Sequence, residues 1–480
     1  MKKRSALSAA RLGLALILLL LAACKGLPEK PPLEPSETPD TIITAREPGT
    51  EEKEEAYLAA LLEATNGGRP DIALEIMEKL INLVPESRSY PVLKAGLLLS
   101  SGKIEDAGKS LVLELEKHPD NVDALFVKSE LDRFSGNAKG SQAALETILA
   151  IDPLNPDANA AMGSLYYDGK NYSKAEESFN KALKEQPDNS NALIGLAKVR
   201  LKRKDEKSAL ALLNRAVDAN PSDALARLDR SRVLYSLGRY ADSEADLDKA
   251  ISLAPGSSWA YVERGRLYMD TGRKEAAKLD LDKSIELDPE YFLPYIYRAA
   301  ILESDGKDSA AFDDYKTAAR LYPDYWYSYE SMAILAWRLG RWQDAYTAFD
   351  KASAYSSAHP EYLIAAGLSL MQAGNMKVAK AYAEKNLPKI SRDKYPAQWL
   401  ALRLVFDQND NVNEFELKIN SEKKLDAKAG LLFYLGVYWA SRGRVPLAVN
   451  YIKMSLDYNR VGSPEYRMAE AELARLQSSK

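Results

Sequence analysis

The stretch AMGSLYYDGKNYSKAEESFNKALKEQPDN, from Ala161 to Asn189, contains four residues whose spacing recurs along most of the chain. Two are small, Gly163 and Ala175; Lys170 lies between them, and Pro187 lies near the end of the stretch. Prolines recur at one constant interval, at positions 85, 119, 153, 187, 221, 255, 289 and 323. A fixed period of about 34 residues is typical of a protein built from repeated helical units.

A second residue series lies 17 positions before the prolines and is mostly glycine. It comprises Gly68, Gly102, Gly136, Lys170, Lys204, Gly238, Gly272, Gly306, Gly340 and Gly374. We expect this residue to end a helix in the left-handed conformation, which glycine adopts without steric cost. The proline then ends a second helix, because proline cannot continue one. Each unit is therefore predicted to be a helix, a tight turn and a second helix.

Two further series are small and fall in the middle of the two predicted helices. Five residues after the glycine series stand Ala73, Ala107, Ser141, Ala175, Ala209, Ser243, Ala277, Ala311, Ala345 and Ala379. Seven residues before it stand Leu61, Ala95, Ser129, Gly163, Ala197, Ser231, Gly265, Ala299, Ala333 and Gly367. Small residues at these places indicate that two helices approach closely. The bulky exception, Leu61, falls in the first unit, where one neighbour is missing. Each unit buries its apolar face only by stacking on the next.

These features together resemble the tetratricopeptide repeat, most clearly in Ala161–Asn189 and in AYVERGRLYMDTGRKEAAKLDLDKSIELDPEY, Ala260–Tyr291. The resemblance implies an all-α, right-handed superhelical solenoid of helix-turn-helix repeats. By the family's numbering, repeats begin at Glu54, Arg88, Val122, Pro156, Ser190, Ala224, Ser258, Phe292, Trp326 and Pro360.

The resemblance also divides the chain into segments. Residues 51–393 form an array of about ten repeats. Residues 394–428 have lost the small residues and the glycine, which indicates a degenerate helical repeat. Residues 429–480 hold a last repeat, LFYLGVYWASRGRVPLAVNYIKMSLDYN, followed by SPEYRMAEAELARLQSSK, which we interpret as a capping helix with a polar outer face.

The first 23 residues have the pattern of a secretory signal peptide. Lys2, Lys3 and Arg4 are followed by an apolar run, Leu12–Ala23, which is too short to span a bilayer. The residues Leu21-Ala22-Ala23-Cys24 resemble the lipobox of bacterial lipoproteins. That resemblance implies cleavage before Cys24, the only cysteine of the chain, and its modification with lipid. An ordinary signal peptide with an incidental cysteine is the alternative.

The segment 24–50 follows the predicted lipidated cysteine and carries six prolines among acidic and polar residues. It lacks the apolar residues that a folded core needs. We therefore expect a semi-rigid, extended tether that holds the repeats away from a membrane. In the enterobacterial version of the lipoprotein family, Asp after the cysteine retains the protein in the inner membrane. Lys25 stands there in this chain, which favours the outer membrane, facing the periplasm.

Composition excludes several classes of site. The two histidines, His118 and His359, each precede a proline in a predicted turn and have no second ligand at metal spacing, so no catalytic residue, metal site or cofactor is predicted. The net charge is −4, and loss of the four basic residues of the signal peptide would leave −8. An acidic mature chain argues against sequence-independent binding of nucleic acid. We find no motif of an enzyme, and we predict none.

Three successive repeats carry an arginine at position 7, where the family usually has an apolar residue, and an aspartate at position 23. The pairs are Arg230 with Asp246, Arg264 with Asp280, and Arg298 with Asp314. In the flanking repeats both positions lose their charge together, as Leu196 with Leu212 and Met332 with Ala348. We interpret the three pairs as structural ion pairs, because a partly buried arginine needs a counter-ion. A role for the arginines in ligand binding is the alternative.

In this family the first helix of each repeat lines the concave groove. Carried over by repeat position, the resemblance predicts partner-binding residues at Lys198, Arg232, Tyr235, Trp259, Arg266, Tyr297, Tyr327 and Trp337. Aromatic residues bury a large area and retain a polar group, which suits a binding surface. Packing of these rings between repeats is the alternative interpretation. The carboxylate clamp of the chaperone-binding family members is absent, since Leu228, Val262 and Ile296 stand at its position 5.

The sequence thus favours a membrane-anchored periplasmic lipoprotein that acts as a protein-binding scaffold or adaptor in assembly or maintenance of the cell envelope. Its expected partners are other envelope proteins or extended peptides, together with the membrane through its N-terminal lipid, and no nucleic acid. The alternative function is delivery of a ligand to, or assistance of, a periplasmic transporter or secretion system. A repeat fold alone does not decide between them.

Overall fold

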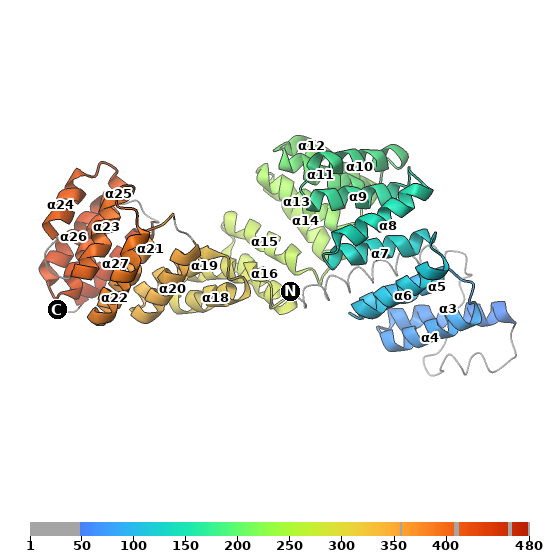
Figure 1. The fold of residues 1–480 in the computed structure, drawn as a ribbon, viewed down its shortest axis with the longest axis horizontal. Helices are drawn as coiled ribbons and strands as arrows, with labels where there is room; N and C mark the ends of the chain where they lie inside the picture. Colours follow the sequence, from blue (N-terminus) through green and yellow to red (C-terminus); the bar gives the residue numbers. More distant parts are fainter. Residues whose placement is uncertain (1–48, 356–357, 408–411, 459–462, 479–480) are drawn as a thin grey trace. The chain divides into compact units, whose positions relative to one another are not determined.

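The computed structural model describes residues 49–355, 358–407, 412–458 and 463–478 (Figure 1). In this part the chain is helical and contains no strand, which confirms the all-α prediction. None of its helices is long and apolar enough to cross a membrane. The predicted signal peptide, Cys24 and all but the last two residues of the tether lie outside the described residues. The chain divides into two compact units, the first of which ends at Arg239 and the second of which begins at Tyr240.

Unit 1 consists of five helix pairs and the first helix of a sixth. Its helices are α3 (Thr50–Asn66), α4 (Pro70–Leu83), α5 (Ser89–Ser100), α6 (Ile104–Lys117), α7 (Val122–Phe134), α8 (Ala138–Ile151), α9 (Pro156–Asp168), α10 (Tyr172–Glu185), α11 (Ser190–Lys202), α12 (Glu206–Ala219) and α13 (Ala224–Ser236). Helix α3 begins at Thr50, four residues before the predicted start of the first repeat.

Unit 2 contains the remaining helices. These are α14 (Tyr240–Leu253), α15 (Ser258–Asp270), α16 (Lys274–Leu287), α17 (Leu293–Ser304), α18 (Asp308–Leu321), α19 (Trp326–Arg338), α20 (Trp342–Tyr355), α21 (Glu361–Gln372), α22 (Met376–Asn386), the 3-10 helix η1 (Leu387–Lys389), α23 (Pro396–Asp407), α24 (Val412–Ser421), α25 (Leu425–Ser441), α26 (Val445–Tyr458) and α27 (Pro464–Ser478). Residues 394–428, predicted as a degenerate repeat, supply the pair α23 and α24.

The turn residues of the glycine series have the predicted conformation. All eight glycines of the series have positive φ, from 63° at Gly68 to 80° at Gly136, and Gly443 in the last repeat has φ 71°. Lys170 and Lys204 adopt the same conformation, with φ 61° and 62°, so the position demands it whatever its residue. The left-handed residue reverses the chain, and the next amide returns to the first helix: Arg273 N–H donates to the carbonyl of Tyr268 at 2.7 Å.

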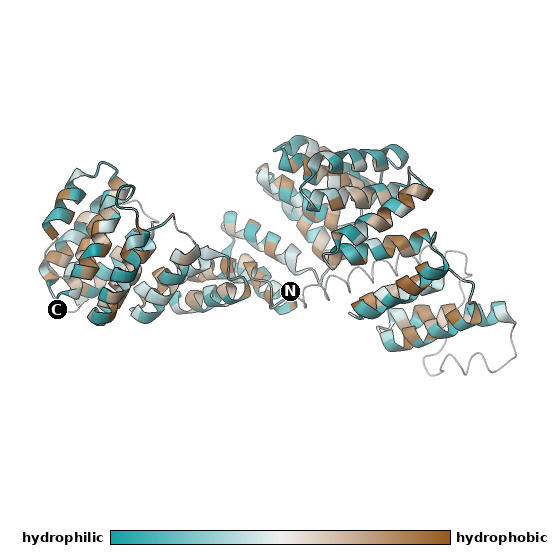
Figure 2. Cartoon of the chain, in the orientation of Figure 1, coloured by the Kyte–Doolittle hydropathy of each residue, from teal (hydrophilic) through white to brown (hydrophobic). Residues whose placement is uncertain are grey.

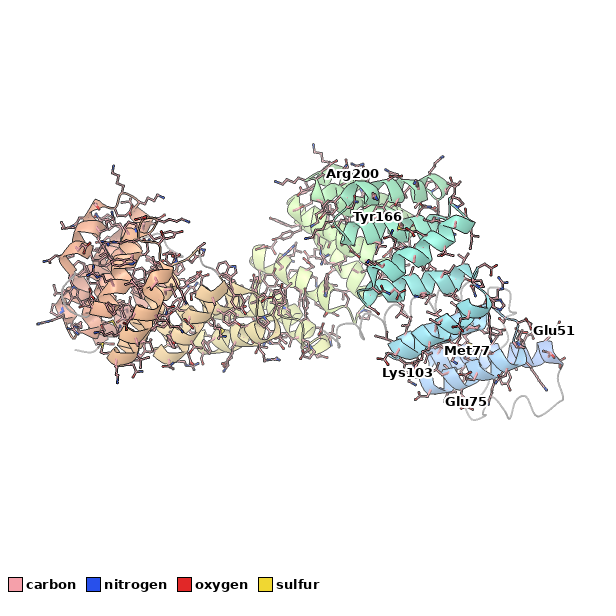
Figure 3. All side chains as sticks on the ribbon, in the orientation of Figure 1. Glu51, Glu75, Met77, Lys103, Tyr166 and Arg200 are labelled. Atoms are coloured by element: carbon pink, nitrogen blue, oxygen red, sulfur yellow. The ribbon has the colours of Figure 1, made fainter. Side chains whose placement is uncertain are left out.

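Small residues are required where the helices cross, as predicted. A Cβ atom on Gly163 would lie 2.6 Å from the ring of Phe179, and one on Gly195 would lie 2.2 Å from it. The Phe179 ring is thus wedged between first helices of successive repeats, α9 and α11, and is 1% exposed. Leu61 is also buried, in a core cluster with Met77 of the first helix pair. Figure 3 shows Met77 on α4, with the exposed Glu75 on the same helix.

Hydrophobic and hydrophilic residues are interleaved along the helices of both units, as expected when a helix buries one face (Figure 2). The largest buried cluster lies in unit 2 and joins α19–α27. Helix α27 packs on α26, as a terminal helix would. It also packs on α19 and α25, which are first helices of other repeats.

Candidate functional site

The two position-7 arginines of unit 2 lie against their predicted aspartates. Arg264 on α15 donates through Nε and Nη2 to both carboxylate oxygens of Asp280 on α16, at 2.7 and 2.8 Å. Arg298 on α17 contacts Asp314 on α18 in the same way, at 2.8 and 2.7 Å. Asp280 is 6% exposed. The hydrogen bonds that its carboxylate accepts raise the pKa of the Arg264 guanidinium above its usual value. These two arginines therefore carry their charge inside the helix pair.

Each arginine also has a second acidic partner, which the sequence pattern was not used to predict. Arg264 also donates through Nη1 to Asp248, and Arg298 donates to Asp282, at 2.7 and 2.6 Å. Both acids belong to the second helix of the preceding repeat, so each arginine joins one repeat to the next. The signal was present in the sequence, because the two acids that bind one arginine stand at equal separations before and after it.

The first of the three predicted pairs spans the division between the units. Arg230 on α13 donates to the side-chain oxygen of Asn214 on α12 at 3.2 Å, which repeats the contact that the other two arginines make with the preceding repeat. Its proposed partner Asp246 is 3% exposed and lies on α14 in unit 2. The pairing of Arg230 with Asp246 stays a prediction.

The basic residues predicted for the groove are paired with acids of the same face. In unit 1, Lys198 Nζ lies 3.1 Å from Asp229, and Arg232 lies 3.3 Å from the same carboxylate. In unit 2, Arg266 lies 3.1 Å from Glu263. The first helices therefore present charge-paired side chains, with Arg232 and Arg266 each bound to an acid three residues before it.

The five predicted groove aromatics fall into three classes of exposure. Trp259 and Tyr327 are 48% and 38% exposed. Tyr235 in unit 1 and Tyr297 in unit 2 are partly buried, and Tyr297 packs against the core cluster that contains Val262 and Leu281. Trp337 is fully buried against Trp342 and Phe433, with ring centroids 5.1 and 5.7 Å away. The prediction that Trp337 lines an accessible groove is wrong, because α19 is covered at that point by the later helices of unit 2.

Trp259 and Tyr327 instead belong to a continuous series of touching rings, which we call the aromatic row. It comprises Trp259, Tyr291, Phe292, Tyr325, Trp326, Tyr327 and His359. Trp259 stacks on Tyr291 with centroids 5.9 Å apart and planes 13° apart. At the other end, Trp326 stacks on His359, also at 5.9 Å. The row therefore extends from α15 to the turn before α21.

The aromatic row is built by the repeat itself. Tyr291, Tyr325 and His359 stand at the same position of three successive repeats, in the turn that precedes a first helix. Phe292 and Trp326, the next residues, follow the same spacing. Consecutive repeats stack, so the rings of one turn reach those of the next: Phe292 lies 5.5 Å from Tyr325. The recurrence of aromatic residues at the repeat period could have identified Tyr291, Phe292 and Trp326 before the structure did.

One end of the aromatic row adjoins two partly buried acidic side chains. His359 Nδ1 lies 2.7 Å from Glu361, and its ring stacks on Tyr362, 5.3 Å away. Tyr362 donates its hydroxyl to Glu330 at 2.9 Å. Burial raises the pKa of Glu330, although the hydrogen bond from Tyr362 opposes the shift. The row thus offers ring faces along its length and a polar, acidic end.

A separate small cleft lies between α20, α21 and α22 in unit 2. Asp350, Tyr382, Lys385, Asn386 and Lys389 are among its lining residues. Tyr382 donates to Asp350 at 3.0 Å. The side-chain oxygen of Asn386 is buried there and has no hydrogen-bond partner among the described residues. Among all the residues that the structure describes, no set of three or more histidine, cysteine, aspartate or glutamate side chains could hold a metal ion.

Three family models, each described as tetratricopeptide repeat, match this chain at residues 166–230, at 225–257 and 260–291, and at 128–190 and 331–389. The matches follow the same repeat period that forms the helix pairs. The chain is a tetratricopeptide repeat protein. Tetratricopeptide repeats form scaffolds for protein–protein interaction, bind peptides or proteins, and are generally non-catalytic.

Several solved structures are similar to this chain. One is a protein of Parabacteroides merdae, with 22% identity, 49% of this chain and 93% of the other covered, and a TM-score of 0.39. Another is YrrB, described as having an unusual peptide-binding site, with 24% identity, 39% and 96% covered, and a TM-score of 0.30. Human IFIT1 shares 19% identity, with 77% and 90% covered and a TM-score of 0.41. No curated protein matches the chain.

Proposed function

We propose that this tetratricopeptide repeat protein is a lipid-anchored scaffold of the bacterial cell envelope, and that its aromatic row holds an extended segment of a partner protein. The observation that carries the proposal is the row itself. Trp259, Trp326 and Tyr327 expose between 36% and 48% of their surface while remaining in ring contact with neighbours. Rings held in place by packing lose little conformational entropy on binding, which favours their use as anchors.

The chemistry of the row suggests what it binds. Ring faces suit proline and aliphatic side chains of an extended peptide, since such side chains stack on aromatic faces and the peptide backbone stays solvated. The acidic end, with Glu361 beside His359, favours a cationic residue at one end of that peptide. At protein interfaces a few buried anchor residues usually contribute most of the binding free energy, and charged residues at the margin contribute less.

Membrane anchoring and location rest on the N-terminal sequence. Cys24 in its lipobox would carry the lipid, and the proline-rich segment after it would place the repeats in the periplasm. Several acyl chains give stable attachment where one chain alone is marginal. Lys25 supports the outer membrane as the site of anchoring. A scaffold that catalyses nothing is consistent with the absence of a catalytic motif from the sequence.

Site-specific photo-crosslinking in intact cells tests this proposal. A photoreactive amino acid would replace Trp259, Tyr327 or, as a matched control, Leu279. Leu279 lies on α16 of the same unit and is 72% exposed, but it is outside the aromatic row. We expect one envelope protein to be trapped from positions 259 and 327 and not from 279. Equal trapping at all three positions, or trapping only at 279, would contradict the proposal.

The alternative, a ligand-delivery partner of a transporter, has one observation in its favour. The buried, unpartnered side-chain oxygen of Asn386 lines the cleft between α20, α21 and α22, where Lys385 and Lys389 also lie. A small molecule with both a hydrogen-bond donor and an anionic group would suit these side chains. Native mass spectrometry of protein purified without denaturant tests it: a retained small molecule that is lost in Asn386→Leu supports delivery, and an unliganded mass excludes it.

A further inference from the structure

The last helix of the chain contacts helices that precede it by more than a hundred residues. Arg475 on α27 donates to the backbone carbonyl of Trp337 on α19 at 3.0 Å, 138 residues earlier. Arg467 on α27 binds Glu303 on α17, 164 residues earlier. A helix that only capped the end of the array would pack on the last helix pair, α25 and α26. Helix α27 also packs on α19, and its polar side chains reach α17 and α21.

Polar side chains on the face that α27 covers are already directed at it. Gln372, the last residue of α21, donates to Glu472 at 2.8 Å. Tyr434 on α25 donates its hydroxyl to Glu465 at 2.8 Å. Without α27, the buried Tyr434 hydroxyl would lose its acceptor, and an unsatisfied buried polar group is destabilising. The face is therefore complementary to a helix that presents acids and arginines at fixed intervals.

The residues that α27 buries occupy one side of the helix. Met468, Ala469, Glu472 and Leu476 are buried, and Glu465 and Arg475 are partly buried. All six are adjacent or three or four positions apart, so they share a face. Glu472 is 1% exposed and Met468 is 1% exposed. Three of these six residues are charged, and Glu472 is the buried one among the three. Buried ion pairs add little net stability relative to apolar packing, but they discriminate strongly between partners.

We propose that the face formed by α17, α19, α21 and α25 is a binding site for an amphipathic α-helix, and that α27 is its occupant in cis. A partner helix binds by displacing α27. The face identifies the partner's chemistry: an acid, an arginine two residues later, a second acid seven residues after the first, and an arginine three residues beyond it. These are the spacings of Glu465, Arg467, Glu472 and Arg475. The site is separate from the aromatic row and goes beyond the scaffold function proposed above.

The covalent link explains why a charge-rich helix stays bound. A tethered segment binds its own chain at an effective concentration of about millimolar, so even weak contacts hold it in place. A free helix must therefore either bind more tightly or be concentrated near the site by another contact. The aromatic row can provide that contact, since it lies in the same unit and also includes residues of α19. The displaced helix would return when the partner leaves.

A synthetic peptide of residues 463–480 tests the proposal on the full chain. The variant Arg467→Glu with Arg475→Glu should release α27, because both arginines would then be replaced by acids that face an acid or a carbonyl. We expect the fluorescent peptide to bind this variant at least about tenfold more tightly than it binds the wild type, where α27 competes. The matched control is a peptide carrying the same two substitutions, which should bind neither protein.

Several outcomes overturn the proposal. Peptide binding to neither protein, equal binding to both, or equal binding of the control peptide would each do so. Circular dichroism must show that the variant keeps its helix content. If the charge-reversal variant loses helix content, the variant Met468→Ala with Leu476→Ala is used in its place. This second variant weakens the packing of α27 without changing its charge. Loss of the fold in both variants would show that α27 is part of the core and cannot be displaced.

Discussion

The guanidinium of Arg264 and the carboxylate of Asp280 form two parallel hydrogen bonds within one helix pair. We predict that Arg264→Met strands the buried aspartate and lowers the stability of unit 2 by about 1–3 kcal/mol. Replacing both residues by leucine should recover much of the loss, as the uncharged pairs of the flanking repeats do naturally. Urea unfolding measures both variants.

The matched control for the ion pair is Lys283, which contacts Glu286 at 2.8 Å with both side chains well exposed. Lys283→Met should change the unfolding midpoint very little, because exposed pairs contribute about 0–1 kcal/mol. If the loss from Arg264→Leu and that from Asp280→Leu simply add in the variant that carries both, the two side chains do not depend on each other and our interpretation is wrong.

The left-handed turn residue gives a second prediction. Gly272 has φ 76°, and a Cβ atom there would meet no other atom within 4 Å. Gly272→Ala should therefore lower stability by about 1–2 kcal/mol through the backbone alone. Gly256 also has open space around it but lacks a positive φ, so Gly256→Ala should be neutral or slightly stabilising. Equal melting temperatures for the two variants would contradict this account.

The same argument predicts a stabilising substitution. Lys170 and Lys204 hold the left-handed conformation with a side chain attached, at φ 61° and 62°. Lys170→Gly should raise the free energy of unfolding by up to about 1 kcal/mol, because relief of the steric cost outweighs the larger entropy of glycine in the unfolded chain. Thermal unfolding measures it. Lys174→Gly, in the helix that follows, should be destabilising.

The attachment of α27 should depend on pH. Burial raises the pKa of Glu465, and the nearby Glu361 and Glu330 raise it further, while the hydrogen bond from Tyr434 opposes them. A carboxyl group whose pKa is higher in the folded state stabilises that state fully below its unfolded pKa, and the stabilisation is lost as the pH rises through the folded pKa. Helix α27 should therefore be bound more firmly at about pH 5 than at pH 7.

Hydrogen exchange of the backbone amides of 464–478, corrected for the intrinsic rate, measures the attachment of α27 at each pH. Glu465→Gln retains an acceptor for Tyr434 and removes the titrating group, so its protection should vary less with pH. Two ion pairs also involve residues of this helix, Arg467 with Glu303 and Arg475 with Glu472. The substitution leaves both ion pairs intact. Identical pH profiles for wild type and Glu465→Gln would refute the assignment.

The proposed membrane attachment depends on Cys24, which lies outside the described part of the chain. Mass spectrometry of the mature protein should find lipid on Cys24 at its N-terminus, and Cys24→Ser should release the repeats from the membrane or leave the signal peptide uncut. A free thiol on Cys24 in the wild type would refute lipidation. Substitution of Ser36 by alanine, within the proposed tether, is the control and should leave attachment unchanged.

The sequence predicted those features that arise within one repeat. The glycine and proline series located the turns, and Asp280 and Asp314 lie where their constant separation from the arginines placed them. Features produced by distant helices were not predictable in this way. Trp337 occupies a position that faces the groove in the family, and only the later helices of unit 2 show that it is covered. A helical period identifies the face of α27 that is buried, but not the helix on which it packs.

Partner capture by the variant Trp259→Ala with Tyr327→Ala tests the central claim most directly. Both rings are exposed, so we predict that the melting temperature changes little while capture of the envelope partner is strongly reduced. Leu279→Ala, at a position that is more exposed and outside the aromatic row, should affect neither quantity. Unchanged capture together with a large drop in melting temperature would show that these rings serve only to pack the repeats, and would contradict the proposal that the aromatic row binds a partner.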